Sequence, residues 1–173
     1  MMAEYVVLDD TSVVPMAESL SYEQAATLPT AGVTAWMGTL GNTALRPGSV
    51  ALVQGTGGVS VLAAQLMAAA GARVIVTSSS DDKLTRIGSF GARDGINYRK
   101  LPAWSTEVMR ITGGHGADLV EELGGKDTLA QSMKSLAYGG TLAIVGGLTG
   151  YDGSVSSLAM IMKTARAQGV YVG

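Results

Sequence analysis

Residues 50–60 read VALVQGTGGVS, and residues 61–71 continue with VLAAQLMAAAG. A short apolar run of the kind that forms a buried strand stops at a cluster of glycines, and an alanine-rich run typical of a helix follows at once. Gly55, Gly57 and Ser60 form a G-x-G-x-x-S array between the two. In such an array the first glycine permits a tight turn, the second admits a pyrophosphate close to the backbone, and the last position must be small. Ser60 stands where glycine is usual, and its small side chain meets that requirement.

Further apolar runs predict the rest of the sheet. Most of them are continuous, as expected for strands that are buried on both faces of a parallel sheet. The predicted strands are 50–54, 73–78, 95–98, 117–123, 141–147 and 169–173. Helical patterns lie between them at 58–70, 81–90, 103–112 and 127–137. This alternation with short connections predicts an α/β fold with a doubly wound sheet.

The residues before the first predicted strand form a different kind of segment. Ser21, with Gln24 three residues later, is a capping-box signal for a short helix that ends near Pro29. A second helix is expected over 31–40. The first 20 residues are expected to hold one strand and a proline-containing connection.

Composition excludes several classes of function. The chain of 173 residues is long enough for one domain with a real core. A net charge of −2, without blocks of like charge, offers no footprint for nucleic acid or an anionic membrane. There is no cysteine, and therefore no disulfide, no thiolate nucleophile and no cysteine-ligated zinc. The only histidine, His115, lies in a glycine turn and is expected to be exposed, while Trp36 and Trp104 are expected to pack. No apolar run reaches membrane-spanning length and no basic leader precedes one, so the expected localisation is cytoplasmic.

The end of the second predicted strand indicates which dinucleotide the glycine turn would hold. NAD-binding domains usually carry Asp or Glu there to bind the ribose 2′-OH. Here Val76–Ser80 contains no acid, and Asp81 comes only afterwards. Small hydroxyls donate to a 2′-phosphate, and Lys83 is within reach to pair with it. This pattern favours NADP(H) over NAD(H). The alternatives are a loop whose serines only cap the next helix and a glycine turn that serves packing alone.

The chain resembles the coenzyme-binding domain of the medium-chain dehydrogenase/reductase superfamily, especially its zinc-independent quinone oxidoreductase-like and alcohol dehydrogenase-like members. The resemblance rests on AEYVV at 3–7, LSYEQAATLPTAGVTAW at 20–36, LRPGSVALVQGTGGVS at 45–60, AGARVIVTSSSDDK at 70–83, INYR at 96–99, ADLVEELGG at 117–125 and GGTLAIVGGLTG at 139–150. It implies a Rossmann fold with six parallel strands in the order 3-2-1-4-5-6.

The resemblance also implies roles for individual residues. Lys83 and Tyr98 match positions that bind the adenosine 2′-phosphate in NADP-dependent members. Residues 146–148 match the loop beside the nicotinamide ribose, Thr34 matches a threonine near the cofactor, and 170–173 match the last strand, which faces the nicotinamide and often pairs across a dimer. The residues expected to bind the cofactor are Thr34, Gly55, Thr56, Gly57, Gly58, Val59, Ser78, Ser79, Lys83, Tyr98, Gly146, Gly147, Leu148 and Val172.

Full members of the superfamily carry an N-terminal catalytic domain and a C-terminal segment that returns to it, and both are expected to be absent here. Residues 1–20 are expected to be a remnant of the junction, with Ala3–Val7 as its strand, and 21–173 to be the NAD(P)-binding Rossmann domain. Thr30 stands where some zinc-binding relatives carry cysteine, so no zinc is expected. Glu121 departs from the family pattern, which is apolar at this position. Because neighbouring strand residues point to opposite faces, Glu121 and Glu122 are not expected to form a paired-carboxylate site.

The resulting hypothesis is the NADP(H)-binding domain of an oxidoreductase that transfers hydride to or from a quinone, enone, aldehyde or alcohol. The expected partners are a small-molecule substrate and a second copy of the chain, paired through the sixth strand. No catalytic residue is assigned within this chain. One alternative is a stand-alone nucleotide-binding or dimerisation module without catalysis. Another is a methyltransferase that uses S-adenosylmethionine, against which the serine run argues, since such proteins typically carry an acid at the end of the second strand.

Overall fold

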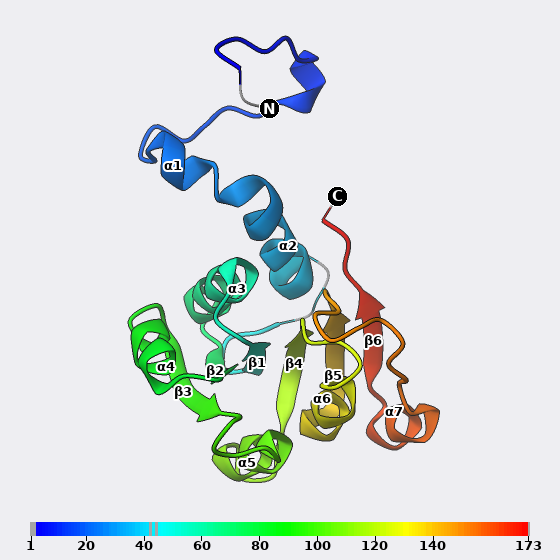
Figure 1. The fold of residues 1–173 in the computed structure, drawn as a ribbon. Helices are drawn as coiled ribbons and strands as arrows, with labels where there is room; N and C mark the ends of the chain where they lie inside the picture. Colours follow the sequence, from blue (N-terminus) through cyan, green and yellow to red (C-terminus); the bar gives the residue numbers. More distant parts are fainter. Residues whose placement is uncertain (1–2, 42, 44, 173) are drawn as a thin grey trace.

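One six-stranded sheet organises the protein, which a computed structural model describes over residues 3–41, 43 and 45–172 (Figure 1). Its strands are β1 (Val50–Gln54), β2 (Arg73–Ser78), β3 (Ala92–Asn97), β4 (Ala117–Glu122), β5 (Leu136–Ile144) and β6 (Arg166–Gly169). They lie in the order β3-β2-β1-β4-β5-β6, and every neighbouring pair is parallel. The predicted α/β fold and strand order 3-2-1-4-5-6 are confirmed.

Helices cover both faces of this sheet, which explains the continuous apolar runs of its central strands. On one face α2 (Val33–Trp36), α3 (Gly58–Ala69) and α4 (Asp81–Gly88) share a core with Ala51 and Val53 of β1. On the other face α5 (Trp104–Ile111), α6 (Leu129–Ser135) and α7 (Ser157–Lys163) share a core with Leu52. All five residues of β1 are buried, so no polar alternation is required along it.

The ends of the helices follow from local chemistry. The Ser80 hydroxyl accepts a hydrogen bond from the Lys83 N–H at 3.4 Å, and Asp81 and Asp82 occupy the positive first turn of α4. Gly91 follows this helix with φ of +101°, and a Cβ there would come within 2.5 Å of the Ala68 Cβ. Only glycine fits this turn, because both the left-handed backbone and the close approach exclude a side chain.

A helical segment precedes the sheet and packs against the ends of its strands. α1 (Tyr22–Ala25) begins with the predicted capping box of Ser21 and Gln24. The helix expected over 31–40 is a run of mixed turns, in which π-helical η2 (Leu28–Gly32) and η3 (Met37–Gly41) flank α2. This run packs on α3, and η3 also contacts β4 and β5. It therefore lies over the carboxyl ends of the central strands.

The strand expected at Ala3–Val7 does not form. No strand lies in the described residues before β1, and only a 3-10 turn, η1 (Asp10–Ser12), interrupts residues 3–20. The side chains there have no core to join, since Tyr5 is 87% and Val7 is 99% exposed. A strand is held by hydrogen bonds to a neighbouring strand, and none lies beside this segment in the described chain.

The C-terminal part also differs from the prediction. The last strand is β6 (Arg166–Gly169), whereas 169–173 was expected; residues 170–172 follow β6 and residue 173 lies outside the described residues. The unpredicted α7 is capped by Thr164, whose φ of +46° is left-handed, and β6 begins to pair with β5 two residues later. Among the described residues, no helix combines the length and apolar character needed to cross a membrane.

Candidate functional site

The order in which successive strands are added to the sheet reverses between β1 and β4. The connection after β1 runs through α3 on one face, whereas the connection after β4 runs through α6 on the other (Figure 1). In a doubly wound sheet such a switch point opens a crevice beyond the carboxyl ends of the strands, and ligands bind there. The glycine turn at 55–59 lies in this crevice.

The turn itself answers why serine takes the place of a glycine. Gly55 has φ of +78°, and its N–H donates to the Thr77 carbonyl oxygen at 2.8 Å. Ser60 is buried, and its Oγ donates to the carbonyl oxygen of Gln54 at 2.8 Å. The hydroxyl thus ties the first turn of α3 to the end of β1, which glycine cannot do. At Gly57 a Cβ would meet no atom within 4 Å, so the start of α3 opens toward the crevice.

A cavity of about 640 Å³ extends along this turn. All the residues predicted to bind a cofactor line it except Val172, which follows β6 and lines neither this cavity nor its neighbour. The lining comprises Thr34, Gly55, Thr56, Gly57, Gly58, Val59, Ser78, Ser79, Lys83, Tyr98, Gly146, Gly147 and Leu148, together with the unpredicted Gln54, Ser60, Leu123, Val145 and Tyr151. Gln54 and Val145 each directly precede a glycine of a predicted loop. This adjacency was the signal in the sequence that could have identified both residues.

The charge of this cavity is set at the end of β2. No carboxylate lines it among the described residues, and Lys83 is its one charged lining residue there. Asp81 is close in sequence, but its carboxylate accepts hydrogen bonds from the side chains of Lys100 and of Asn97, the latter at 2.7 Å. These two hydrogen bonds lower the pKa of Asp81, and the bond from Lys100 has the larger effect. The carboxylate of Asp81 is therefore bound to Lys100 and Asn97 and does not line the cavity.

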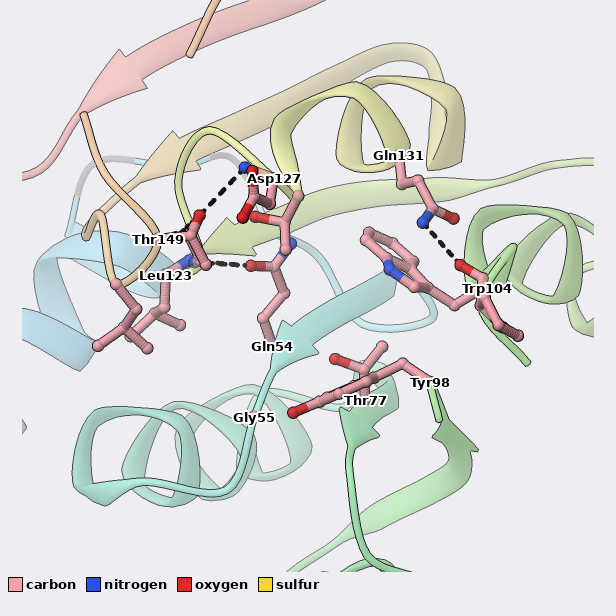
Figure 2. Close-up of a pocket in the computed structure, with 13 residues that line it drawn as sticks. Gln54, Gly55, Thr77, Tyr98, Trp104, Leu123, Asp127, Gln131 and Thr149 are labelled. Atoms are coloured by element: carbon pink, nitrogen blue, oxygen red, sulfur yellow. Dashed lines mark hydrogen bonds between the residues drawn. The ribbon is translucent and has the colours of Figure 1, made fainter. Parts of the chain in front are cut away.

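A second cavity of about 370 Å³ adjoins the first and is more apolar (Figure 2). The two share Gln54, Gly55, Tyr98, Leu123 and Leu148, and Trp104 and Gln131 line the second one only. Figure 2 shows Gln54 between Leu123 on one side and Trp104 on the other. Trp104 is buried as expected, yet it forms a cavity wall, whereas Trp36, also expected to pack, is half exposed. This mostly apolar slot beside Trp104 suits an aromatic ring.

Two adjacent carboxyl groups at the end of β4 have opposite surroundings, as the alternation along a strand predicts. Glu122 is fully buried and accepts hydrogen bonds from five donors. Glu121 is fully buried on the other face, and neither of its oxygens has a hydrogen-bond partner among the residues that the structure describes. A Cβ on Gly38 would lie 3.2 Å from Glu121 Oε1, so η3 sits directly over this carboxyl. Desolvation raises the pKa of Glu121 to about 8, which keeps the group neutral at pH 7.

A metal site is not found among the described residues, where no three His, Asp or Glu side chains come together. His115 is exposed, as predicted, and its Nε2 lies 3.0 Å from Asp118 Oδ1. This pair lies at the amino end of β4, opposite both cavities. The residues present in the described chain therefore do not form a zinc site.

Comparisons with known proteins place the chain among dehydrogenases. The family model described as zinc-binding dehydrogenase matches residues 58–173. A zinc-type alcohol dehydrogenase-like protein of Schizosaccharomyces pombe is 41% identical over 98% of this chain and 51% of its own length. A quinone oxidoreductase-like protein 2 homolog of Nematostella vectensis is 33% identical over 99% of this chain and 47% of its own. The chain thus spans about half the length of the curated relatives it matches.

Solved structures agree with the fold. The structure of an NAD-dependent alcohol dehydrogenase superposes with a TM-score of 0.89 at 39% identity, covering 97% of this chain and 49% of that one. A mycobacterial protein solved in complex with NADPH superposes with a TM-score of 0.83 at 28% identity, covering 91% of this chain and 50% of that one. One relative is therefore described with NAD and the other with NADPH.

Proposed function

We propose the function of this chain from its family, because the chain belongs to the zinc-binding dehydrogenases of the medium-chain dehydrogenase/reductase superfamily. The sheet and the helices that cover it form the nucleotide-binding domain of an oxidoreductase. The finer proposal is that this domain binds NADP(H) in preference to NAD(H). It serves an enzyme that transfers hydride between the cofactor and a small quinone, enone, aldehyde or alcohol.

The charge of the larger cavity carries the preference for NADP(H). Ser78 and Ser79 line it where a 2′-OH-binding acid would stand, and Lys83 is its charged residue. A carboxylate would repel a 2′-phosphate, whereas hydroxyls donate to it and an ammonium group pairs with it. The nearest acid, Asp81, is bound to Asn97 and Lys100 instead.

The lining of the two cavities suits the rest of a dinucleotide. Residues 55–59, at the start of α3, would hold the pyrophosphate on backbone N–H groups. The slot beside Trp104 would take the adenine ring, while Thr34 and residues 146–148 would border the nicotinamide half, with Leu148 lining both cavities. When bound, the cofactor supplies or accepts the hydride. The part of this chain is to orient the cofactor and to hold its phosphates.

Titration of the purified chain with NADPH and NADH by calorimetry tests the proposal. Lys83→Ala is expected to weaken NADPH binding about tenfold or more and to leave NADH binding unchanged, since a charge-assisted contact is worth about 1.5–3 kcal/mol. Lys134→Ala is the matched control, because Lys134 is exposed on α6 and lines neither cavity. Tighter binding of NADH, or equal losses for both cofactors, would refute the 2′-phosphate assignment.

We also propose that residues 1–20 are a junction with a catalytic domain, that 21–173 are the NAD(P)-binding domain, and that two copies pair through β6. The outer edge of β6 has no neighbouring strand in the described chain, and such an edge is a template for pairing. Light scattering at increasing concentration tests the pairing. A monomer throughout would refute it.

A further inference from the structure

The buried carboxylate of Glu122, at the end of β4, accepts hydrogen bonds from the loop that follows this strand and from the start of α6. Glu122 Oε1 accepts hydrogen bonds from the N–H groups of Gly124 and Gly125, both at 2.9 Å, and from the Thr128 hydroxyl. Its Oε2 accepts from the Ser132 hydroxyl and from Gln54 Nε2, the latter at 2.7 Å. Glu122 has no exposed surface. A charge without water must be satisfied by such donors, so the loop is fixed wherever they are fixed.

Gln54 links this cluster to the glycine turn. It is the last residue of β1 and directly precedes Gly55. Its Oε1 accepts hydrogen bonds from the N–H groups of Leu123 at 3.1 Å and Gly124 at 3.0 Å, while its Nε2 donates to Glu122 and to Ser132 Oγ at 2.6 Å. Both ends of the amide are therefore used, and the strand ends on either side of the switch point are joined.

The loop held in this way forms a wall of both cavities. Leu123 lines both, and Gly124 lines the smaller one beside Trp104. Gly124 and Gly125 have no side chains, so hydrogen bonds to the backbone hold the loop. Gln54 and Glu122 bind its N–H groups, and the N–H and hydroxyl of Thr149 donate to the Gly124 carbonyl oxygen at 2.8 and 2.9 Å. Gly125 has φ of +92°, and a Cβ there would lie 2.4 Å from the Gly150 carbonyl oxygen. The N–H groups of Leu123, Gly124 and Gly125 all donate to Gln54 or Glu122, so the position of the loop depends on this pair together with Thr149.

We infer that Gln54 and Glu122 are a pair of positioning residues that set the affinity for the adenosine half of the cofactor. The inference rests on the proposed function, because it assigns the slot beside Trp104 to adenine. The pair acts through Leu123 and Gly124. Thr34 and Val145 border the other half of the larger cavity, and no hydrogen bond in the described chain joins either of them to the side chains of the pair. The Val145 N–H donates only to the backbone carbonyl oxygen of Glu122, at 2.9 Å, a bond that a change of the Glu122 side chain leaves in place.

Calorimetric binding of 2′,5′-ADP, the adenosine fragment of NADP, tests the pair. Ser132→Ala removes one donor to Glu122, and Ser135→Ala is its matched control, because the Ser135 hydroxyl donates to the Gln131 carbonyl oxygen within α6. We expect Ser132→Ala to weaken binding about three- to tenfold and Gln54→Leu about tenfold or more, with Ser135→Ala within about twofold of wild type.

The exchange Gln54→Glu with Glu122→Gln separates positioning from simple loss of stability. It keeps one amide and one carboxylate, so position 54 can still accept from Leu123 and Gly124 while the amide at position 122 donates to it. Recovery of affinity to within about threefold of wild type supports the inference. Equal effects of Ser132→Ala and Ser135→Ala, or an exchange as weak as Gln54→Leu alone, would overturn it. A wild-type chain that fails to bind 2′,5′-ADP would overturn the NADP(H) proposal as well.

Discussion

Glu121→Gln is expected to remove a pH dependence from the free energy of unfolding. The wild-type carboxyl is fully buried under η3 and has no hydrogen-bond partner in the described part of the chain. The elements that pack around this carboxyl include α2, η3, α3 and β1, and none of these four contains a titratable residue. In the neighbouring strand β5, Tyr138 is 78% exposed. The protonation of Glu121 therefore depends on its own burial and not on a neighbouring charge.

The direction of the effect follows from the two pKa values of this group. Burial raises the pKa of Glu121 in the folded chain to about 8, against an ordinary 4.5. Below pH 4.5 the carboxyl is protonated in both states, and its contribution to stability is fully present. As the pH rises from 4.5 to about 8 the unfolded chain releases the proton and the folded chain does not, so stability is lost across this window. Above pH 8 the loss is complete.

The magnitude is large for a domain of this size. The step from 4.5 to about 8 corresponds to a total loss on the order of 5 kcal/mol, at about 1.4 kcal/mol per pH unit. Between pH 5.5 and 7.5 the expected loss is about 2.5 kcal/mol, a substantial share of the roughly 5–15 kcal/mol typical of folded domains.

Urea unfolding followed by circular dichroism at pH 5.5, 6.5 and 7.5 measures this loss. The unfolding free energy of Glu121→Gln minus that of wild type should rise by about 1.4 kcal/mol per pH unit, since other titrating groups cancel in the difference. Glu18→Gln, at an exposed acid, is the matched control. A constant difference for Glu121→Gln would show that the folded chain ionises this carboxyl, and would refute the reasoning.

Two further substitutions test contacts that hold the sheet and its helices together. Ser60→Ala removes the hydrogen bond from the buried hydroxyl to the Gln54 carbonyl oxygen and should lower the unfolding free energy by about 1 kcal/mol; unchanged thermal unfolding would contradict that role. Lys163→Met removes an ammonium group that donates to the carbonyl oxygens of Met133 at 3.2 Å, Lys134 at 2.8 Å and Leu136. It should cost about 1–3 kcal/mol in urea unfolding, whereas Lys134→Met, at an exposed side chain, should cost little.

The fold was predictable where burial alone determines the strand. β1 and β2 have the predicted bounds because nearly all their residues are buried on both faces. β6 was misplaced because its sequence, RAQG, is polar, and it lies at an edge with mostly exposed side chains. Its position is set by hydrogen bonds to β5, whereas the apolar residues 170–172 lie beyond the strand. The prediction of a strand at Ala3–Val7 was wrong for a related reason, because no strand of the described chain pairs with this apolar run.

The site was predictable where its residues are close in sequence. The G-x-G-x-x-S array, the serines after β2 and the glycines after β5 each lie at a strand end, so the parallel sheet brings them to one edge. The different surroundings of Glu121 and Glu122 depend instead on what covers each face of β4. Helix residues near 38 cover one face, and Gln54 with Ser132 meets the other. Contacts across 10 to 80 positions leave no local pattern.

Trp104 gives the molecule an internal optical reporter. It is one of two tryptophans in the chain, and its buried ring forms a wall of the smaller cavity, whereas Trp36, the last residue of α2, is half exposed. Indole emits light in the range that a reduced nicotinamide absorbs, so a bound NADPH would quench Trp104 by energy transfer. A Trp36→Phe background would leave a single tryptophan, beside the smaller cavity. Occupancy of the crevice would then be visible in solution without any attached label.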